Sequence, residues 1–146
     1  MDQRYESLRL ENQICFPLYA ASREVIKQYR PYLDALGLTY TQYIAMMVFW
    51  EEKQLSVKEL GKKLFLDSGT LTPVLKSLEA KGFVLRSRSK ADERMLSVEI
   101  TEKGELLKEQ AASIPGSVAA CVKLDPDEAI QLYQLLYKIL GAFQEE

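Results

Sequence analysis

The chain of 146 residues has no histidine and only two cysteines, Cys15 and Cys121, which lie far apart in the sequence. Without an imidazole, neither a Ser-His-Asp triad nor a Cys-His nucleophile pair can form. The cysteines also lack the close spacing of a zinc site, so we expect no metal and no other cofactor. These absences exclude the triad hydrolases and the common zinc proteins.

Long apolar runs are missing as well. No stretch approaches the roughly eighteen uncharged apolar residues of a membrane-spanning helix, so we expect no membrane partner. The first residues, MDQRYESLRLE, are polar and partly acidic, unlike a secretory signal. We therefore expect a cytoplasmic protein, in which structural disulfides are rare. The length predicts one domain that spans residues 1–146.

Charge is present but unevenly distributed. The net charge is −2, yet residues 56–95 hold nine Lys and Arg against five Asp and Glu, while the rest of the chain holds ten and sixteen. A basic centre between acidic flanks is typical of a nucleic-acid-binding face. Taken alone, the charge pattern is explained more simply by a solvated surface.

Helical patterns cover the first part of the chain. One pattern runs from Leu10 to about Arg30, where Pro31 is expected to end or bend the helix. The motif Thr39-x-x-Gln42 is a capping box, which predicts the start of a second long helix.

Two shorter helices follow. A capping box that begins at Ser56 predicts a helix over SVKELGKKLF. The segment LDSGTLTPVLKSLEAKG predicts another helix, which Asp67 or Ser68 caps and Gly82 stops. Because a proline disrupts a helix interior, we expect a boundary at Pro73.

The segments FVLRSR and MLSVEI predict a β-hairpin, because they are rich in β-branched and apolar residues and the polar loop SKADER separates them. Two short helices followed by a basic hairpin make a winged helix-turn-helix, at about residues 40–100. The flanking parts, about 1–38 and 101–146, are predicted to be dimerisation helices. The expected fold class is therefore mainly α with a small β wing.

The last part of the chain is predicted to be helical. Thr101 caps a helix that appears kinked at residues 114–116 in the sequence pattern, and Asp125 starts a final helix that ends at about Phe143. That helix carries a wide apolar stripe of Ile130, Tyr133, Leu136, Tyr137, Leu140 and Phe143. The stripe packs either in the chain's own core or against a second copy. We favour a homodimer, since DNA-reading helices usually come as two-fold pairs.

Side chains for contact with double-stranded DNA are predicted on the 67–82 helix and on the hairpin. The helix side opposite the Leu/Val stripe carries small hydroxyls and a lysine that suit a major groove, namely Ser68, Thr70, Thr72, Lys76 and Ser77. Arg86 and Arg88 share one face of a strand. Arg94 closes the loop, where it suits a narrow A·T-rich minor groove, and Asp92 is placed to pair with it. The alternatives are an ordinary solvent-facing helix and a weak surface ion pair.

With these segments in place, the chain resembles the MarR family and, within it, the organic hydroperoxide resistance regulators, the OhrR group. The likeness covers nearly all of the chain and is carried by LENQICFPLYAASREVIKQYRPYLDALGLTYTQY, by LDSGTLTPVLKSLEAKGFVLRSRS with the wing DER, and by ITEKG. The cysteine of NQICFPLY with the nearby tyrosines is the narrower signature. The resemblance implies a homodimeric repressor that leaves an inverted-repeat operator when an organic hydroperoxide oxidises the cysteine.

Cys15 is the candidate redox sensor. A thiol attacks peroxide as the thiolate, and a helix that starts at Phe16 would place Cys15 at its positive end. Tyr19, at i+4, shares that helical face. Tyr29, fourteen residues from Cys15, lies about 21 Å along the axis, so it reaches only the thiol of a partner whose first helix runs antiparallel. The resemblance assigns Tyr29 and Tyr40 to hydrogen-bonding the sensor thiol of the other subunit.

Several alternatives stay open. Cys15 is otherwise a small buried hydrophobe, and the protein is then a MarR-type repressor released by a small phenolic ligand. Cys121 is either a resolving thiol, which forms an intersubunit disulfide with oxidised Cys15, or a packed thiol in the kinked helix. If Cys121 does not resolve it, a small thiol is the group that would react with oxidised Cys15. A thiol peroxidase is a further alternative. The sequence argues against it, because the catalytic arginine–threonine loop on an α/β scaffold is missing and a basic wing is present. A module without a DNA role is opposed by the charge of residues 56–95. We therefore expect a protein that is not an enzyme.

Overall fold

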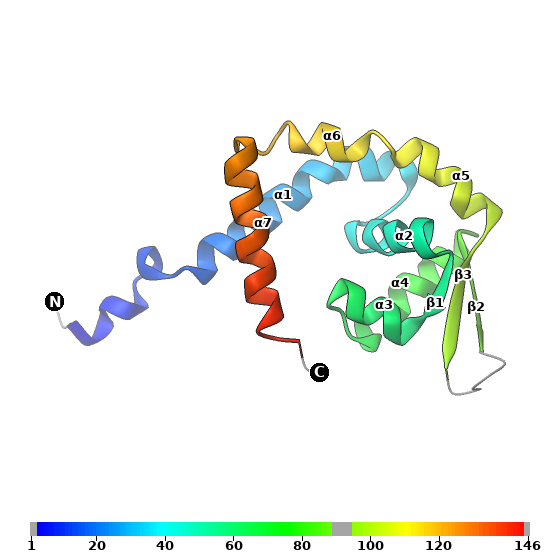
Figure 1. The fold of residues 1–146 in the computed structure, drawn as a ribbon, viewed down its shortest axis with the longest axis horizontal. Coiled ribbons are helices and arrows are strands. Elements are labelled where there is room, and N and C mark those ends of the chain that lie inside the picture. The colour runs from blue at the N-terminus through cyan, green and yellow to red at the C-terminus, as the bar shows by residue number, and fades with distance from the viewer. Residues whose placement is uncertain (1–2, 89–94, 145–146) are drawn as a thin grey trace.

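The computed structural model describes residues 3–88 and 95–144, which form a mainly helical structure with a small sheet (Figure 1). The elements are η1 (Gln3–Leu8), η2 (Leu10–Asn12), α1 (Cys15–Leu36), α2 (Tyr40–Glu52), β1 (Gln54–Ser56), α3 (Val57–Leu64), α4 (Ser68–Ala80), β2 (Val84–Arg88), β3 (Leu96–Ile100), α5 (Glu102–Ala111), α6 (Ile114–Ala119) and α7 (Pro126–Gly141).

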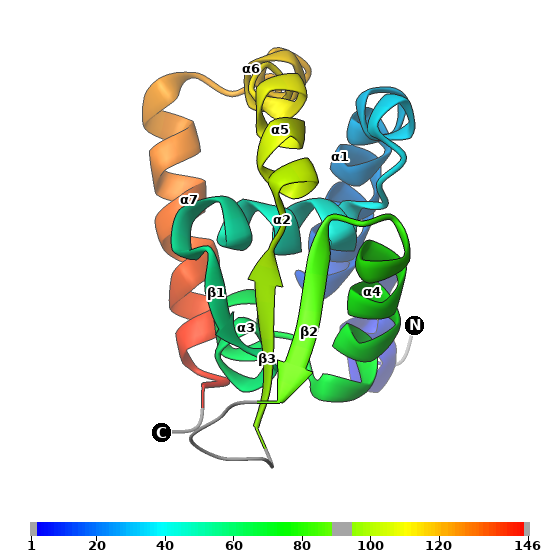
Figure 2. The ribbon, with the colours of Figure 1, turned by 90° about the vertical axis from the view of Figure 1, so that its right-hand side faces the viewer.

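The predicted hairpin is confirmed and belongs to a three-stranded antiparallel sheet with the order β1-β3-β2. Arg88 lies opposite Leu96 at one end of the β2–β3 ladder. The strand β1 was not predicted, because three residues are too few to show an alternating pattern. Its Leu55 pairs with Val98 of β3. Figure 2 shows the sheet in front of α3 and beside α4, which is the winged-helix arrangement predicted from the sequence.

The core of this lobe lies between α2, α3, α4 and the sheet. Its largest fully buried side chains are Phe49, Met46, Leu60, Leu71, Leu75, Leu78, Val84 and Val98. Burying each such side chain contributes about 1.5–3 kcal/mol. The indole N–H of Trp50, which also belongs to the core, donates a hydrogen bond of 2.9 Å to the buried carbonyl of Gly104, which ties α2 to the first turn of α5.

Helix starts follow the capping signals of the sequence. Thr39 and Gln42 form the reciprocal capping box of α2. Of the two candidates for α4, Asp67 is the cap, and its carboxylate accepts from the Thr70 N–H. The side chain of Ser56 caps α3 as expected. These local hydrogen bonds fix where each helix of the winged lobe begins.

Pro73 was predicted to mark a helix boundary and Pro31 to end or bend its helix, and neither helix ends at its proline. The helix α1 continues through Pro31 and ends at the left-handed Gly37, whose φ is 70°. Pro73 lies inside α4, and no boundary forms there. Both prolines are exposed. Each removes one hydrogen bond, and for Pro73 the carbonyl that loses its donor belongs to exposed Gly69. A proline in a helix interior costs about 3 kcal/mol or more, so packing of the opposite face must offset that cost for each helix to stay continuous.

The terminal helices lie outside the winged lobe. α1 packs against α2, α5 and α6. Figures 1 and 2 together show α5 and α6 as an arch, from which α7 turns back on the side opposite α1. The kink predicted at residues 114–116 is a break at residues 112–113, just before α6. Asp125 caps α7 as predicted, but the helix ends at Gly141 and has no buried residue.

An ion pair joins the recognition helix α4 to the wing strand β2. The Glu79 carboxylate accepts from the Arg86 backbone N–H at 2.9 Å and from its guanidinium at 3.2 Å. These hydrogen bonds, the backbone one first, hold the pKa of Glu79 below its ordinary value. The pair, which we call the helix–wing clasp, therefore fixes the wing against the end of α4.

The clasp predicts a pH-dependent stability. Because the folded-state pKa of Glu79 is depressed, the stability from its carboxylate is present above the unfolded value of 4.5 and is lost as pH falls through the folded value. The difference in Tm between the wild type and Glu79→Gln is expected to shrink between about pH 6 and about pH 3. Thermal unfolding followed by circular dichroism measures it. A difference that stays constant over this range contradicts the clasp.

Gly104 is predicted to be the most sensitive glycine of the sheet–helix junction. A Cβ at this position would collide with the Phe83 carbonyl oxygen and stand 2.8 Å from Cγ1 of Ile100. Gly104→Ala is expected to lower the free energy of unfolding by about 1–3 kcal/mol. Chemical denaturation measures the change. Gly116→Ala is the matched control, since no heavy atom lies within 4 Å of its Cβ and alanine favours the helix.

Candidate functional site

The outer side of α4 presents most of the predicted DNA contacts. Ser68, Thr70, Thr72 and Lys76 are all exposed. The Thr72 hydroxyl donates a hydrogen bond of 2.7 Å to the Ser68 carbonyl, so it stays close to the helix. Ser77 differs from the prediction, because its hydroxyl accepts from the amide of Gln42 and therefore faces α2.

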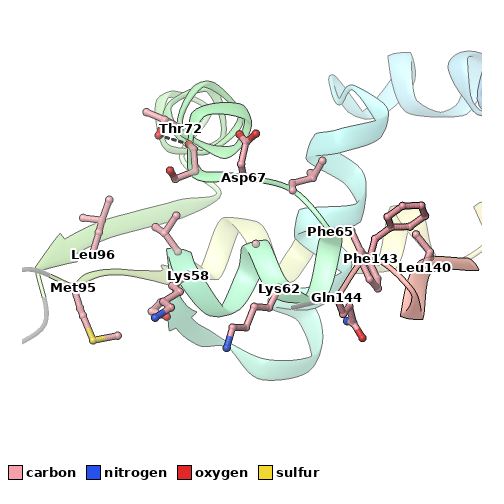
Figure 3. Close-up of a pocket in the computed structure, with 15 residues that line it drawn as sticks. Lys58, Lys62, Phe65, Asp67, Thr72, Met95, Leu96, Leu140, Phe143 and Gln144 are labelled. Carbon is pink, nitrogen blue, oxygen red and sulfur yellow. Dashed lines mark hydrogen bonds between the residues drawn. The ribbon is translucent and has the colours of Figure 1, made fainter. Parts of the chain in front are cut away.

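Two lysines of α3 extend this polar surface. Lys58 and Lys62 line an open groove that also includes Ser68 and Thr72 of α4, and Figure 3 shows them projecting from α3. Their spacing of four residues places them on one helical face. They were counted in the basic segment but not assigned to a site. The signal available in the sequence was their position directly after the Ser56 capping box.

The wing contributes differently from the prediction. Arg86 is half-buried in the helix–wing clasp and is held by Glu79. Arg88 lies at the end of β2 and is exposed. The predicted wing-tip residues Asp92 and Arg94 lie outside the described residues. Within the described wing, Arg88 is therefore the more exposed of the two arginines.

The first turn of α1 carries the candidate sensor. Cys15 is the first residue of the helix and is exposed, so regular helix begins there and not at Leu10. The N-cap residue, Ile14, offers no side-chain cap, and Pro17 in the first turn has no N–H. The thiol thus stands at the positive end of a long helix without a competing carboxylate cap. Within one chain, the alternative of a buried core cysteine is wrong.

Tyr19 shares the exposed end of α1 with the thiol. Its ring lies beneath the Arg23 guanidinium, at 5.5 Å from the ring centroid. Among the described residues, no hydrogen bond joins Tyr19 to Cys15. The structure places the phenol on the predicted face, one turn along the helix, as an exposed side chain.

The other two predicted tyrosines gather at the far end of α1. The rings of Tyr29 and Tyr40 have centroids 5.0 Å apart, and Tyr43 lies 5.7 Å from Tyr29. Burial, followed by the charge of Tyr29, raises the pKa of the Tyr40 phenol above its ordinary value. The structure brings these tyrosines together but separates them from the Cys15 of the same chain by almost four helical turns.

Cys121 lies in the turn that joins α6 to α7, just after the C-cap of α6. It is exposed, and its Sγ lies 3.7 Å from the Ser117 carbonyl oxygen. The alternative of a packed thiol inside a kinked helix is therefore wrong. Both cysteines are free in the structure.

The helix α7 presents an apolar surface that the described chain leaves uncovered. Exposed side chains on it include Ile130, Leu132, Tyr133, Leu135, Tyr137, Ile139 and, just beyond, Phe143. At about 100° per residue they occupy well over half of the circumference. The phenol of Tyr133 raises the pKa of Tyr137. The alternative that the stripe packs into the chain's own core is wrong for a single chain.

In residues 3–88 and 95–144, no group of three or more His, Cys, Asp or Glu side chains is arranged to hold a metal ion. Over the same residues, no helix has the length and hydropathy needed to cross a membrane.

Comparison with known proteins now identifies the family. The model of the SarA/Rot transcriptional regulators matches residues 27–111. The organic hydroperoxide resistance transcriptional regulator of Bacillus subtilis is 46% identical over 146 residues, which is all of this chain and 99% of that protein. The regulator SarZ of Staphylococcus saprophyticus is 46% identical over 132 residues, 90% of each chain.

Solved structures agree with the sequence relatives. Reduced AbfR bound to DNA has a TM-score of 0.76 at 34% identity, covering 98% of this chain and 100% of its own. AbfR with a disulfide formed has a TM-score of 0.64 at the same identity, covering 94% and 96%. The fold and the full-length relatives exclude the thiol peroxidase considered from the sequence. The chain belongs to the MarR family, in the group of organic hydroperoxide resistance regulators, and is a DNA-binding transcriptional regulator that senses by cysteine oxidation.

Proposed function

We propose that the protein is a homodimeric repressor that binds an A·T-rich inverted-repeat operator and leaves it when an organic hydroperoxide oxidises Cys15. The observation that carries this proposal is the exposed thiol at the N-terminus of α1. Exposure lets a peroxide reach this thiol, and an accessible cysteine is the kind that a peroxide oxidises to a sulfenic acid.

The chemistry of sensing is a two-electron oxidation. The Cys15 thiolate attacks one oxygen of the O–O bond, which breaks and leaves a sulfenic acid on the protein. The departing alkoxide takes a proton and leaves as the alcohol. Apolar neighbours such as Phe16 and Leu18, both partly exposed beside the thiol, suit an organic substituent better than a fully hydrated peroxide.

A second copy of the chain completes the arrangement. The uncovered apolar surface of α7 needs a partner, and Tyr29 and Tyr40 are too far along α1 to reach the thiol of their own chain. An antiparallel pairing of two α1 helices brings the tyrosines of one subunit toward Cys15 of the other. We therefore assign residues 40–100 to DNA binding, and 1–38 and 101–146 to dimerisation.

The proposed DNA face consists of α3, α4 and the wing. Lys58, Lys62 and Lys76 supply phosphate attraction, while the hydroxyls at the start of α4 suit the major groove. Arg94 is assigned to the minor groove, with Asp92 as the partner that fixes its direction, and Arg88 adds positive charge at the end of β2.

Cys121 is proposed as the resolving thiol. The disulfide form of AbfR provides a precedent in a relative of 34% identity. The exposed Cys121 thiol of the partner subunit would attack the sulfenic sulfur of Cys15, forming the disulfide and releasing water. A small thiol that caps Cys15 is the alternative outcome.

A phenolic ligand is the second candidate trigger. The groove between α3 and the end of α7 has aromatic walls from Phe65 and Phe143 and two lysine side chains (Figure 3). An aromatic anion would find both apolar contact and positive charge there. In that case Cys15 has no part in release.

Removing a proposed phosphate contact is expected to weaken binding at all sequences alike. Lys76→Ala and Lys62→Ala should each lower the slope of log K against log salt by about one. Fluorescence anisotropy at several salt concentrations measures the slope. Lys108→Ala is the matched control, because this exposed lysine of α5 lies outside the proposed face. Equal slopes for all four proteins would refute the assignment.

Cys15→Ser is expected to keep DNA binding and lose the response to oxidant. Anisotropy on an A·T-rich inverted repeat during addition of cumene hydroperoxide should show release of the wild type and retention of the variant. If both proteins leave the DNA, or neither does, Cys15 is not the sensor, and the phenolic trigger becomes the leading candidate.

Cys121→Ser separates the two fates of the sulfenic acid. Intact-mass analysis after oxidation is expected to show a crosslinked dimer for the wild type and none for the variant. A wild type that stays uncrosslinked and binds an added small thiol contradicts the resolving role of Cys121.

A further inference from the structure

A buried amide connects the recognition helix to the corner between α1 and α2. The side chain of Gln42 is 7% exposed. Its Nε2 donates to the Ser77 hydroxyl of α4 at 3.0 Å. Its Oε1 accepts from the Thr39 N–H at 3.1 Å and from the Lys81 ammonium at 2.9 Å. A buried amide with partners on two elements resists displacement, because breaking any bond leaves a polar atom unsatisfied.

Lys81 extends this connection. It follows the last residue of α4, and its ammonium also donates to the Gly37 carbonyl at the C-cap of α1. Its own backbone carbonyl accepts from Lys103 of α5 at 2.9 Å. A cation is favourable at the C-terminal end of a helix. The Lys81 ammonium lies at the C-terminal end of α1, while the Lys81 backbone forms the C-cap of α4. We call Gln42, Ser77 and Lys81 the corner network.

The corner network lies next to a residue of the proposed sensor. Tyr40 is the first residue of α2, between the network partner Thr39 and Gln42 two positions on. Its ring packs against Tyr29 and Tyr43. A shift of Tyr40 therefore moves the first turn of α2, and the hydrogen bonds of Gln42 pass that movement to Ser77 on the recognition helix.

We infer that Gln42 and Lys81 are positioning residues that couple the sensor tyrosines to the orientation of α4. The inference rests on the proposed function. In the reduced protein the network holds α4 at the angle that fits DNA. When oxidation of Cys15 displaces the partner's tyrosines, the α1–α2 corner moves and carries the C-terminal end of α4 with it. Neither residue touches the peroxide or the thiol.

The test measures how strongly oxidation changes DNA affinity. For each protein, anisotropy gives the Kd for the operator in the reduced and in the oxidised state. The coupling is the Kd of the oxidised protein divided by the Kd of the reduced protein. Gln42→Met keeps the length of the side chain and removes its hydrogen bonds. We expect the ratio to fall about tenfold, while the rate of Cys15 oxidation, followed by intact mass, stays at the wild-type value.

A conservative variant separates positioning from simple stability. In Gln42→Glu the carboxylate still accepts from the Thr39 N–H and the Lys81 ammonium, and the Ser77 hydroxyl can reverse and donate. This variant is expected to retain the wild-type ratio. Gln54→Met is the matched control, since Gln54 also bonds a serine, Ser97, but lies on the sheet outside the network. Its ratio should stay unchanged.

The outcomes are distinguishable. If the wild type releases DNA on oxidation and Gln42→Met does so to the same extent, the coupling role is wrong while the proposed function stands. If the wild type keeps its DNA after Cys15 is oxidised, the proposed function fails and the coupling role fails with it. Should Gln42→Met not fold, Lys81→Met carries the same expectation from the more exposed end of the network, and a wild-type ratio there overturns the inference.

Discussion

The apolar surface of α7 is the constraint on which the rest of the molecule depends. The winged lobe buries its core around Phe49, Leu60 and Leu71 within a single chain. The helix α7 buries none of its side chains, although it is among the most apolar segments of the chain. Exposing such an area to water is unfavourable, and a surface this large marks an interaction site. The chain is thus a self-contained reading lobe joined to helices whose packing is unfinished in one copy.

This division explains why the candidate sensor is split along α1. On the proposed function the thiol needs access to an oxidant, and it lies at the exposed beginning of the helix. The tyrosines that the family resemblance assigns to it lie at the opposite end, packed against Tyr43, which in turn contacts Trp50 of the core. One helix thus holds a reactive group at one end and a connection to the core at the other. Two copies are needed for these ends to meet.

Much of the fold was predictable, because local side-chain hydrogen bonds determine it. The Thr39 and Asp125 caps are present as the sequence indicates. The failures share a different cause. Pro31 was expected to end or bend its helix and Pro73 to mark a boundary, but both helices continue, because packing of the opposite face offsets the cost of the proline. Contacts between residues that are far apart in the sequence could not be predicted either.

The candidate site was also only partly predictable from the sequence, for the same reason. The helical spacing placed the hydroxyls of α4 correctly on the outer face, with the exception of Ser77, whose partner Gln42 lies thirty-five positions away in sequence. Arg86 was predicted to contact DNA because it lies two residues before Arg88 on the same strand, so that both side chains are on one face. Its actual partner, Glu79, belongs to another element. Periodicity reports which face a residue occupies, and it carries no information on which distant group meets that face.

The helix–wing clasp has a consequence for how the operator is discriminated. Because Glu79 binds both the backbone and the guanidinium of Arg86, the clasp holds the wing strand against the recognition helix. On the proposed function, the helix and the wing would then contact two neighbouring grooves at a fixed separation. Duplexes whose local twist or groove width departs from that separation are penalised through deformation energy, even at base pairs the protein does not touch. Selectivity then resides partly in the mechanics of the DNA itself.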